Sequence, residues 1–533
     1  MAESMPTEQG PRPIAQLLDR WRAEGRLIGA GHAPTPSSAG DAAIGIGVSG
    51  VQDDSRAVEP GNLFVAVRGL RVDGHDYVGQ AIERGAAAVA VEHRVGELPV
   101  PQLIVDRGAA SLASAAAWWY GDPSRHLLTV GVTGTNGKTT TSFLAAAGLA
   151  GAGFATGLIG TIGIRVGGQF VPNHEPNTTP GALTLQRTLR EMVDAGEQAV
   201  IIETSSHGLA ADRVASVDYD GAIFTNLSHE HLDFHGTFDA YRWAKVSLFE
   251  RLPQHARGGR PGVGVVNADD PHANAFIDAT RGAKALPVTY GERPEADVRL
   301  MGLSVEASGT HVKVQVAGRA RKLRLRLPGR FNAYNAMAVL GLAHGWGLDL
   351  DTVSAALEGV AGVPGRMERV DLGQRFMVVI DYAHTSASLD AVLRELQAMT
   401  KRGHGVITVV GASGERDTGK RPLMGEAAAR RSRLLIVTED DSRNEDPAAI
   451  FQAIAAGAEG AGKRWGDDLL VIGDRRAAIA EAFRRARPGD IVLIAGKGHE
   501  TWNVGPNGPE PWSDRGTAEE LLAGKSGAQP KAR

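Results

Sequence analysis

Short apolar runs separated by helical patterns recur through the middle of this chain. They lie at residues 127–132, 199–202, 222–225 and 262–266, with helical stretches between them. Apolar runs of this length between helices are typical of strands in a parallel sheet that is covered on both faces. The pattern therefore predicts βα alternation, and with it an α/β domain built on a parallel sheet.

Two further patterns extend this prediction. Residues 311–316 and 322–327 alternate apolar and polar side chains strictly, which predicts half-exposed antiparallel strands appended to the sheet. Residues 44–122 mix short β-like runs with an alanine-rich helical pattern and predict a small α/β unit. Helices again separate a last set of strand-like runs, at 377–380, 406–410, 434–437, 469–472 and 491–495.

The length of 533 residues exceeds what one hydrophobic core can support, since cores stop growing at roughly 250 to 300 residues. We therefore expect three α/β domains. They are a small N-terminal domain at 1–124, a central parallel-sheet domain at 125–362 and a Rossmann-like C-terminal domain at 363–533. The aperiodic ends, 1–12 and from 524 onward, are expected to be loose, as is a stretch at 29–40.

Composition excludes several classes of function. Lysine and arginine number 57 against 61 acidic residues, so the net charge of −4 gives no electrostatic case for binding nucleic acid or an anionic membrane. The absence of cysteine excludes disulfides, thiolate metal sites and a cysteine nucleophile, so that metal ligands would be oxygen or imidazole. No apolar run is long enough for a signal peptide or a membrane span, which predicts a cytoplasmic protein.

A glycine-rich segment carries the strongest chemical signal. It runs from Gly131 to Thr140 as GVTGTNGKTT, after a buried strand and before an alanine-rich helix. In that context backbone N–H groups cradle phosphates, Lys138 offsets their charge and Thr139 can ligate magnesium. The general phosphate-loop pattern has glycine where Val132 stands. We interpret the segment as a phosphate loop, which makes the central domain a P-loop-type ATPase.

The segment from Thr133 to Thr140 resembles the phosphate loop shared by Mur ligases and folylpolyglutamate synthetases. Resemblance to Mur ligases extends from about residue 53 to residue 517 and is carried by many separate motifs. It implies an ATP-dependent amide-bond-forming enzyme, acting as a monomer on UDP-MurNAc-L-Ala-D-Glu, ATP and a diamino acid in cell-wall synthesis. The residues that the resemblance assigns to ATP are Gly134, Thr135, Asn136, Gly137, Lys138, Thr139, Thr140, Asn335, Arg366 and Asp381.

Three further residues bear on metal binding. Glu203 follows an apolar strand and, like Thr139, offers an oxygen ligand that suits magnesium. From the residues alone, the histidine-rich segment around His231 fits a hydrogen-bonded turn as well as a metal site, and Lys245 reads as a solvated helix lysine. The resemblance instead implies two magnesium ions, with His231 and a carbamoylated Lys245 as ligands of the second.

The resemblance also assigns catalytic and substrate-binding roles. Lys138 and Arg366 would neutralise charge on the transferred phosphoryl group, Lys245 would act as its carbamate, and His384 would orient or deprotonate a reacting group. Hydroxyls and one arginine suit the diphosphate and carboxylates of the UDP substrate. The residues implied there are Ser55, Thr178, Thr179, Ser205 and Arg213.

Loops of the third domain would select the incoming amino acid. Diaminopimelate-adding members of the family carry Asp-Asn-Pro-Arg, and this chain has Asp-Asp-Ser-Arg at 440–443. Arg443 suits the distal carboxylate of meso-diaminopimelate, whereas the extra carboxylate of Asp441 suits the bare ammonium of lysine or ornithine. We favour diaminopimelate, with lysine or ornithine as the alternative. The residues implied are Arg416, Asp440, Asp441, Ser442, Arg443, Gly496 and Glu500.

Two rival functions remain at this stage. A folylpolyglutamate synthetase is disfavoured by the separate N-terminal unit with its Asp-Ser-Arg motif at 54–56 and by the residues 440–443. A nucleotide-dependent switch without amide chemistry is disfavoured by Glu203, His231 and Lys245. Acceptor-dependent release of ADP would distinguish the ligase from the switch.

Overall fold

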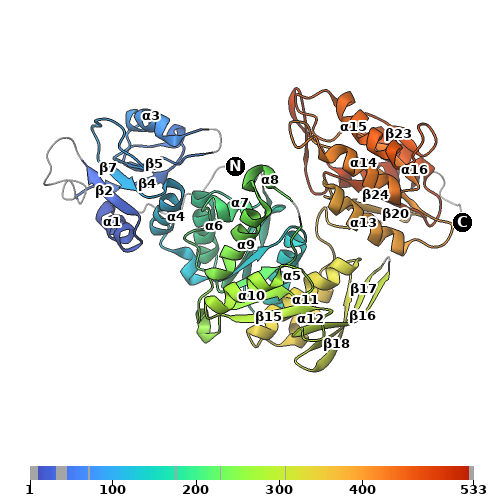
Figure 1. Cartoon of the computed structure of the whole chain (residues 1–533), viewed down its shortest axis with the longest axis horizontal. Coiled ribbons are helices and arrows are strands. Elements are labelled where there is room, and N and C mark those ends of the chain that lie inside the picture. Colours follow the sequence, from blue (N-terminus) through green and yellow to red (C-terminus); the bar gives the residue numbers. More distant parts are fainter. Residues whose placement is uncertain are drawn as a thin grey trace, which may run out of the picture. The chain divides into compact units, whose positions relative to one another are not determined.

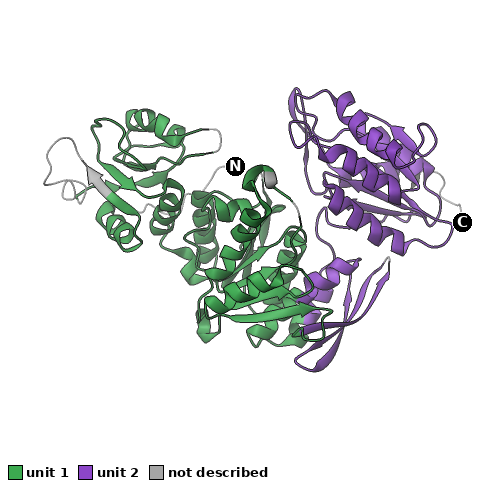
Figure 2. Ribbon diagram, viewed as in Figure 1, with its two compact units in different colours: residues 1–297, 338–353 green, residues 298–337, 354–533 purple. Residues whose placement is uncertain are grey.

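In the computed structural model the chain forms two compact units (Figure 2). The first contains residues 1–297 and 338–353, and the second contains 298–337 and 354–533. The predicted domain boundaries at 124/125 and 362/363 stay a prediction. The structure describes residues 10–31, 45–69, 72–173, 177–228, 230–306 and 308–526.

A five-stranded sheet near the N-terminus confirms the predicted small α/β unit (Figure 1). Its order is β2-β7-β6-β5-β4, and only the β2–β7 pair is antiparallel. Of the stretch at 29–40 that was expected to be loose, residues 29–31 belong to β2, so the prediction is wrong there, and residues 32–40 lie outside the described residues. The elements are α1 (Ile14–Ala23), β2 (Leu27–Gly31), β4 (Gly50–Gln52), η1 (Ser55–Ala57), β5 (Asn62–Val65), α3 (Val78–Glu83), β6 (Ala88–Val91), β7 (Gln102–Val105) and α4 (Gly108–Trp119).

The larger sheet of the first unit has the order β11-β10-β9-β12-β8-β13-β14-β15. The pairs from β9 to β15 are parallel, whereas β10 pairs antiparallel with both β9 and β11. Strands β8, β12, β13 and β14 are buried along their whole length, which is why they appear in the sequence as continuous apolar runs. The strands are β8 (Leu128–Thr133), β9 (Thr156–Ile159), β10 (Gly163–Val166), β11 (Gln169–Pro172), β12 (Ala199–Glu203), β13 (Gly221–Phe224), β14 (Val263–Asn267) and β15 (Leu286–Gly291). The helices are α5 (Lys138–Gly151), α6 (Ala182–Asp194), α7 (Ser206–Ala210), α8 (Leu232–His235), α9 (Phe238–Glu250) and α10 (Ala273–Gly282).

The second unit contains the predicted antiparallel strands and a second parallel sheet. Strands β17 (Gly309–Val316) and β18 (Arg319–Leu325) pair antiparallel, as their period of two predicts. Strand β16 (Val298–Glu306), which was not predicted, pairs antiparallel with β17. The six-stranded sheet has the order β19-β20-β24-β21-β22-β23 and is parallel apart from β19. Its strands are β19 (Glu368–Val370), β20 (Met377–Asp381), β21 (Val406–Val410), β22 (Leu434–Val437), β23 (Leu469–Val471) and β24 (Ile491–Ala495).

Helices and one hairpin complete the chain. Helix α17 continues to Ser526, so the prediction of a loose tail from residue 524 is wrong for its first residues. The helices are α11 (Arg330–Gly345), α12 (Leu350–Gly359), α13 (Ser386–Met399), α14 (Lys420–Arg431), α15 (Pro447–Gly460), α16 (Arg475–Arg485) and α17 (Asp514–Ser526), and the hairpin is β25 (Trp502–Gly505) with β26 (Gly508–Pro511). Among the described residues, no helix combines the length and the apolar character needed to cross a membrane.

A buried ion pair joins the start of α16 to the start of α17. Nε and one terminal nitrogen of Arg475 each donate to the Asp514 carboxylate over 2.7 Å. The remaining donors of Arg475 bond the carbonyls of Glu439 and Ala495, both over 3.0 Å, and Trp512 Nε1 donates to Asp514 over 2.9 Å. The polar atoms of this buried pair therefore have partners, as burial of charge requires.

Removing one member of this pair tests its contribution to stability. We expect Asp514→Ala to lower the free energy of unfolding by about 3–5 kcal/mol, because it leaves the buried Arg475 guanidinium without its counter-charge. The matched change is Glu520→Ala on the same helix, whose exposed pair with Arg476 should contribute almost nothing. Chemical denaturation of the full chain measures both. Equal losses in the two variants would contradict the prediction.

Candidate functional site

The glycine-rich segment lies between the buried strand β8 and helix α5, as predicted. Gly137 has φ 86° and caps the helix, which begins at Lys138. Gly134 has φ 147°, and a Cβ atom there would lie 1.9 Å from Thr225 Oγ1. Only glycine fits this position, because an added methyl group would displace the loop.

Two lysine side chains converge on one carbonyl of this loop. The Gly134 oxygen accepts from Lys138 Nζ over 3.0 Å and from Lys245 Nζ over 2.8 Å. Lys245 is 1% exposed, and burial, followed by the nearby charge of Lys138, holds its pKa well below the usual value. The amine is therefore poised to be neutral.

The expectation from the residues alone, that Lys245 is a solvated helix lysine, is wrong. The side chain lies on the buried face of α9 with Tyr241, Leu248 and Phe249. These residues follow a spacing of three and four, which places them on one side of a helix. That spacing is the signal in the sequence that could have identified a buried lysine.

Glu203 lies at the end of β12 and reaches the start of α5. Its carboxylate accepts from Thr139 Oγ1 over 3.0 Å, from Thr161 Oγ1 over 2.9 Å and from the Thr161 backbone N–H over 3.2 Å. Thr161 did not emerge from the sequence, where a threonine after a strand carries no distinctive pattern. The hydroxyl and carboxylate oxygens meet next to the phosphate loop, as oxygen ligands for magnesium would.

Residues after β13 hold the phosphate loop from the other side. The Asn226 side-chain oxygen accepts from Asn136 N–H over 3.0 Å, and Thr225 Oγ1 donates to the Asn136 carbonyl over 2.6 Å. The hydroxyls of Thr135 and Tyr241 lie 2.9 Å apart. These contacts fix the backbone of the loop before any ligand binds.

His231 presents a neutral imidazole. Burial lowers its pKa to about 4, and the nearby charge of Lys138 adds to this effect. Its ring lies edge-on to that of His207, with 4.6 Å between centroids. A neutral ring nitrogen is the form that ligates a metal ion. The oxygens near Glu203, the neutral ring of His231 and the low pKa of Lys245 fit the predicted binding of magnesium. The roles of these residues as metal ligands stay predictions.

Four of the five residues predicted for the UDP substrate lie close together. The hydroxyls of Thr179 and Ser205 are 3.1 Å apart, and the guanidinium of Arg213 donates to the Thr179 carbonyl over 3.0 Å. Thr178 Oγ1 accepts from Thr161 over 3.1 Å, which connects this group to Glu203. Ser55 lies elsewhere, in the turn η1, where its hydroxyl donates to Gln80 over 2.6 Å.

In the second unit, Arg366, Asp381 and His384 lie next to Tyr382. The Arg366 guanidinium lies over the Tyr382 ring, 4.6 Å from its centroid, and His384 Nδ1 lies 2.8 Å from the Tyr382 carbonyl. Asp381 accepts from two backbone N–H groups, over 2.8 and 2.9 Å, and burial raises its pKa against the opposing effect of Arg366. On α11, Asn335 donates to Asn332 over 3.1 Å.

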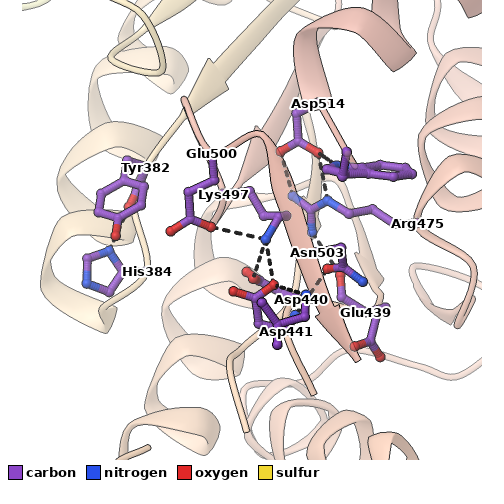
Figure 3. Close-up of polar contacts among 12 residues, drawn as sticks. Tyr382, His384, Glu439, Asp440, Asp441, Arg475, Lys497, Glu500, Asn503 and Asp514 are labelled. Atoms are coloured by element: carbon purple, nitrogen blue, oxygen red, sulfur yellow. Dashed lines mark hydrogen bonds and ion pairs between the residues drawn. The ribbon is translucent and has the colours of Figure 1, made fainter. Parts of the chain in front are cut away.

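Six of the seven predicted amino-acid-binding residues follow β22 or β24, and Arg416 follows β21. Figure 3 shows three of the six, Asp440, Asp441 and Glu500, around Lys497. Asp441 Oδ1 accepts from Lys497 Nζ and from the Val504 N–H, both over 2.8 Å. Lys497 also lies 3.0 Å from Glu500 and 3.7 Å from Asp440. Lys497 has no signal in the sequence, because a lysine between two glycines has no pattern that predicts burial.

The remaining members of this group differ in exposure. Arg443 has φ 55°, its backbone N–H donates to Val504 O over 2.9 Å, and its Nε is buried without a hydrogen-bond partner among the described residues. The Ser442 N–H donates to Glu439 over 2.8 Å. A Cβ at Gly496 would lie 2.2 Å from the Asp440 carboxylate, so glycine is required there. Arg416 is exposed.

A glycine-rich loop between a parallel strand and a helix, with acidic and basic groups around it, is typical of nucleotide-binding domains. Comparison with known families gives the class of this chain. Residues 132–343 match the Mur ligase middle domain, 365–498 match the Mur ligase glutamate ligase domain, and 47–118 match the catalytic domain of the Mur ligase family. The chain belongs to the Mur ligase family, whose members are ATP-dependent ligases that form amide bonds.

Individual relatives narrow this class. The chain is 46% identical over 484 residues to a UDP-N-acetylmuramyl-tripeptide synthetase of Roseiflexus, covering 89% of this chain and 94% of the relative. It is 41% identical over 471 residues to a UDP-N-acetylmuramoyl-L-alanyl-D-glutamate–2,6-diaminopimelate ligase of Geobacillus kaustophilus, covering 88% and 94%. A solved structure of a ligase with that same name is 31% identical, covers 90% of this chain and 96% of its own, and has a TM-score of 0.64.

The geometry of Gly134 gives a first test of this site. We expect Gly134→Ala to weaken ATP binding at least about tenfold, because strain at a positive φ adds to the clash with Thr225. The displaced carbonyl would also lose its bonds to Lys138 and Lys245. Gly282→Ala is the control, since a Cβ there meets open space. Calorimetric titration with ATP measures both, and equal affinities would contradict the prediction.

Proposed function

We propose that this enzyme adds meso-diaminopimelate to the γ-carboxylate of D-Glu in UDP-MurNAc-L-Ala-D-Glu, with ATP as the energy source. The names of relatives at 46% and 41% identity support the UDP-linked substrate whose carboxylate forms the new amide bond. The match of residues 47–118 to a Mur ligase domain disfavours a folylpolyglutamate synthetase. We propose that it acts as a monomer in the cytoplasm.

The hydrogen bonds of the Asp441 carboxylate are the observation that favours diaminopimelate as the amino acid added. In the sequence, this extra carboxylate argued for the bare ammonium of lysine or ornithine. In the structure its Oδ1 accepts from Lys497 and from the Val504 N–H, so its charge is partly offset by an ammonium that Asp440 and Glu500 also face. Arg443, with a buried Nε that lacks a partner among the described residues, is then left to bind a distal carboxylate. Lysine and ornithine remain the alternative acceptors.

The proposed reaction has two steps. A γ-carboxylate oxygen of D-Glu attacks the γ-phosphorus of ATP, and the bond to the β,γ-bridging oxygen breaks. ADP departs, and D-Glu now carries an acyl phosphate. The neutral amine of diaminopimelate then attacks the acyl carbon, phosphate departs, and the amine loses a proton. Exclusion of water protects the acyl phosphate from hydrolysis. His384, 2.8 Å from the Tyr382 carbonyl, is proposed to orient a reacting group or accept a proton.

Charge on the transferred phosphoryl group is neutralised by basic side chains. Lys138, at the N-terminus of α5, and the peptide N–H groups of the loop face the phosphates in this proposal. Arg366 offers a planar guanidinium, held over Tyr382, to the γ-phosphate. Thr139 and Glu203 would hold one magnesium ion and His231 and Lys245 the second, and bound magnesium supplies further neutralisation of phosphate oxygens.

Lys245 is proposed to act as a carbamate. A neutral amine reacts with carbon dioxide, forming a C–N bond and losing one proton, and the product is an anionic oxygen ligand. The burial of Lys245 and the charge of Lys138 support this chemistry, because both favour the neutral amine. Its Nζ lies 2.8 Å from the Gly134 carbonyl, next to the phosphate loop.

Acceptor-dependent phosphate release tests the proposed function. With UDP-MurNAc-L-Ala-D-Glu and ATP present, we expect release to be stimulated by meso-diaminopimelate and far less by L-lysine or L-ornithine. A preference for lysine or ornithine would overturn the choice of acceptor while leaving the ligase intact. No stimulation by any of the three would overturn the ligase proposal itself.

Replacing Arg443 tests the basis of that preference. We expect Arg443→Ala to raise the KM for meso-diaminopimelate at least about 30-fold, because a charge-assisted bond to the distal carboxylate is lost. The KM for L-lysine, which has no such carboxylate, should change little. Arg476→Ala, an exposed arginine of the same unit, is the control. Equal changes for both acceptors would show that Arg443 does not read the carboxylate.

The carbamate at Lys245 has a spectroscopic signature. With ¹³C-bicarbonate, we expect a carbamate carbon signal in the wild-type protein that is absent in Lys245→Met, together with a fall in kcat of at least about 100-fold. The exposed Lys401→Met is the matched control and should keep both the signal and the activity. Full activity of Lys245→Met would contradict the proposed role.

A further inference from the structure

Lys497 is a buried cation enclosed by acidic side chains. Its side chain is 0% exposed, and its Nζ lies 2.8 Å from Asp441, 3.0 Å from Glu500 and 3.7 Å from Asp440 (Figure 3). The oxygens of these three carboxylates lie within 4.8 Å of one another, a spacing that a metal ion could use. The ammonium of Lys497 already lies among them, so the protein supplies its own cation there.

This ammonium keeps the carboxylates compatible with burial. Burial raises the pKa of Asp440 and of Glu500, and in both cases Lys497 is the largest opposing influence. Burial alone would lower the pKa of Lys497, but the three carboxylates outweigh it and raise the pKa. The lysine is therefore charged, and it offsets carboxylates that would otherwise repel one another.

Lys497 is connected through Asp441 to the loop that contains Arg443. Val504 on β25 donates its N–H to the Asp441 carboxylate and accepts from the backbone N–H of Arg443. Asp441 and Arg443 thus share one anchoring residue, and both have a positive φ, 50° and 55°. An Asp441 carboxylate without a cation would add negative charge beside the arginine proposed to receive the distal carboxylate.

We propose that Lys497 is a positioning residue that sets selectivity for the incoming amino acid. By neutralising Asp441 and holding its carboxylate in place, it allows the loop of Arg443 to accept an amino acid that carries a distal carboxylate. This inference rests on the proposed function, because it concerns the acceptor of that same reaction. Lys497 acts through Asp441 and need not touch the substrate.

The test is Lys497→Met, which keeps the length of the side chain and removes its charge. We expect the KM for meso-diaminopimelate to rise at least about tenfold, since Asp441 would then repel the distal carboxylate. The KM for L-lysine should not rise, because its distal ammonium is attracted to the freed Asp441 carboxylate and not repelled by it. Where L-lysine is not a substrate, its inhibition constant against diaminopimelate replaces the KM.

A second variant separates charge balance from general support of the fold. Asp441→Asn combined with Lys497→Met removes one negative and one positive charge together, and asparagine keeps the oxygen that accepts from Val504. We expect the KM for meso-diaminopimelate to return to within about threefold of wild type. A lysine with a merely structural role would not be rescued by Asp441→Asn.

Lys463→Met provides the matched control. Lys463 is also a largely buried lysine of the second unit, and it pairs with Asp468 over 3.1 Å. It should leave the ratio of kcat/KM for the two amino acids unchanged. If Lys497→Met does not fold, Asp441→Asn alone provides the test. It should raise the ratio of kcat/KM for diaminopimelate to that for L-lysine. An unchanged ratio overturns the inference.

The outcomes distinguish this inference from the proposed function. A wild-type enzyme that releases no phosphate with any acceptor refutes the proposed function. An active wild-type enzyme in which Lys497→Met raises the KM for both amino acids equally refutes the inference alone. Failure of the double variant to restore the KM also refutes it.

Discussion

The first unit depends on one carbonyl oxygen that serves two lysines. Gly134 O accepts from Lys138 at the start of α5 and from Lys245 on α9, so the phosphate loop and the buried amine are positioned together. This arrangement requires the φ of 147° that only glycine adopts without strain. The charge of Lys138 then depresses the pKa of Lys245 beyond what burial achieves. The conformation of the loop therefore also sets the position and the pKa of Lys245.

The two buried lysines show how strongly surroundings decide the behaviour of one residue type. Lys245 lies beside another cation and a carbonyl, and its pKa falls well below the usual value. Lys497 lies among three carboxylates, and its pKa rises although burial opposes it. Desolvation acts on both in the same direction, and the sign of the neighbouring charges decides the result. The first lysine is suited to reaction with an electrophile, the second to permanent charge.

Much of the fold was predictable from the sequence, and part of the site was not. The parallel strands β8, β12 and β13 are buried throughout, so they appear as uninterrupted apolar runs that periodicity detects. Contacts that join residues far apart in the chain leave no such local pattern. Thr161 bonds Glu203, 42 residues away, and Lys497 bonds Asp441, 56 residues away. Their partners are set by sheet topology, which spacing along the chain does not encode.

The pair of Arg475 and Asp514 has a practical consequence for anyone who shortens this protein. Asp514 is the first residue of α17, and it supplies the counter-charge for an arginine whose side chain is 3% exposed. A truncation that ended before residue 514 would remove no part of the six-stranded sheet. It would, however, leave the buried Arg475, which bonds the last carbonyl of β24, without its counter-charge. Shortened versions of this protein should therefore include α17, although every strand of the sheet precedes it.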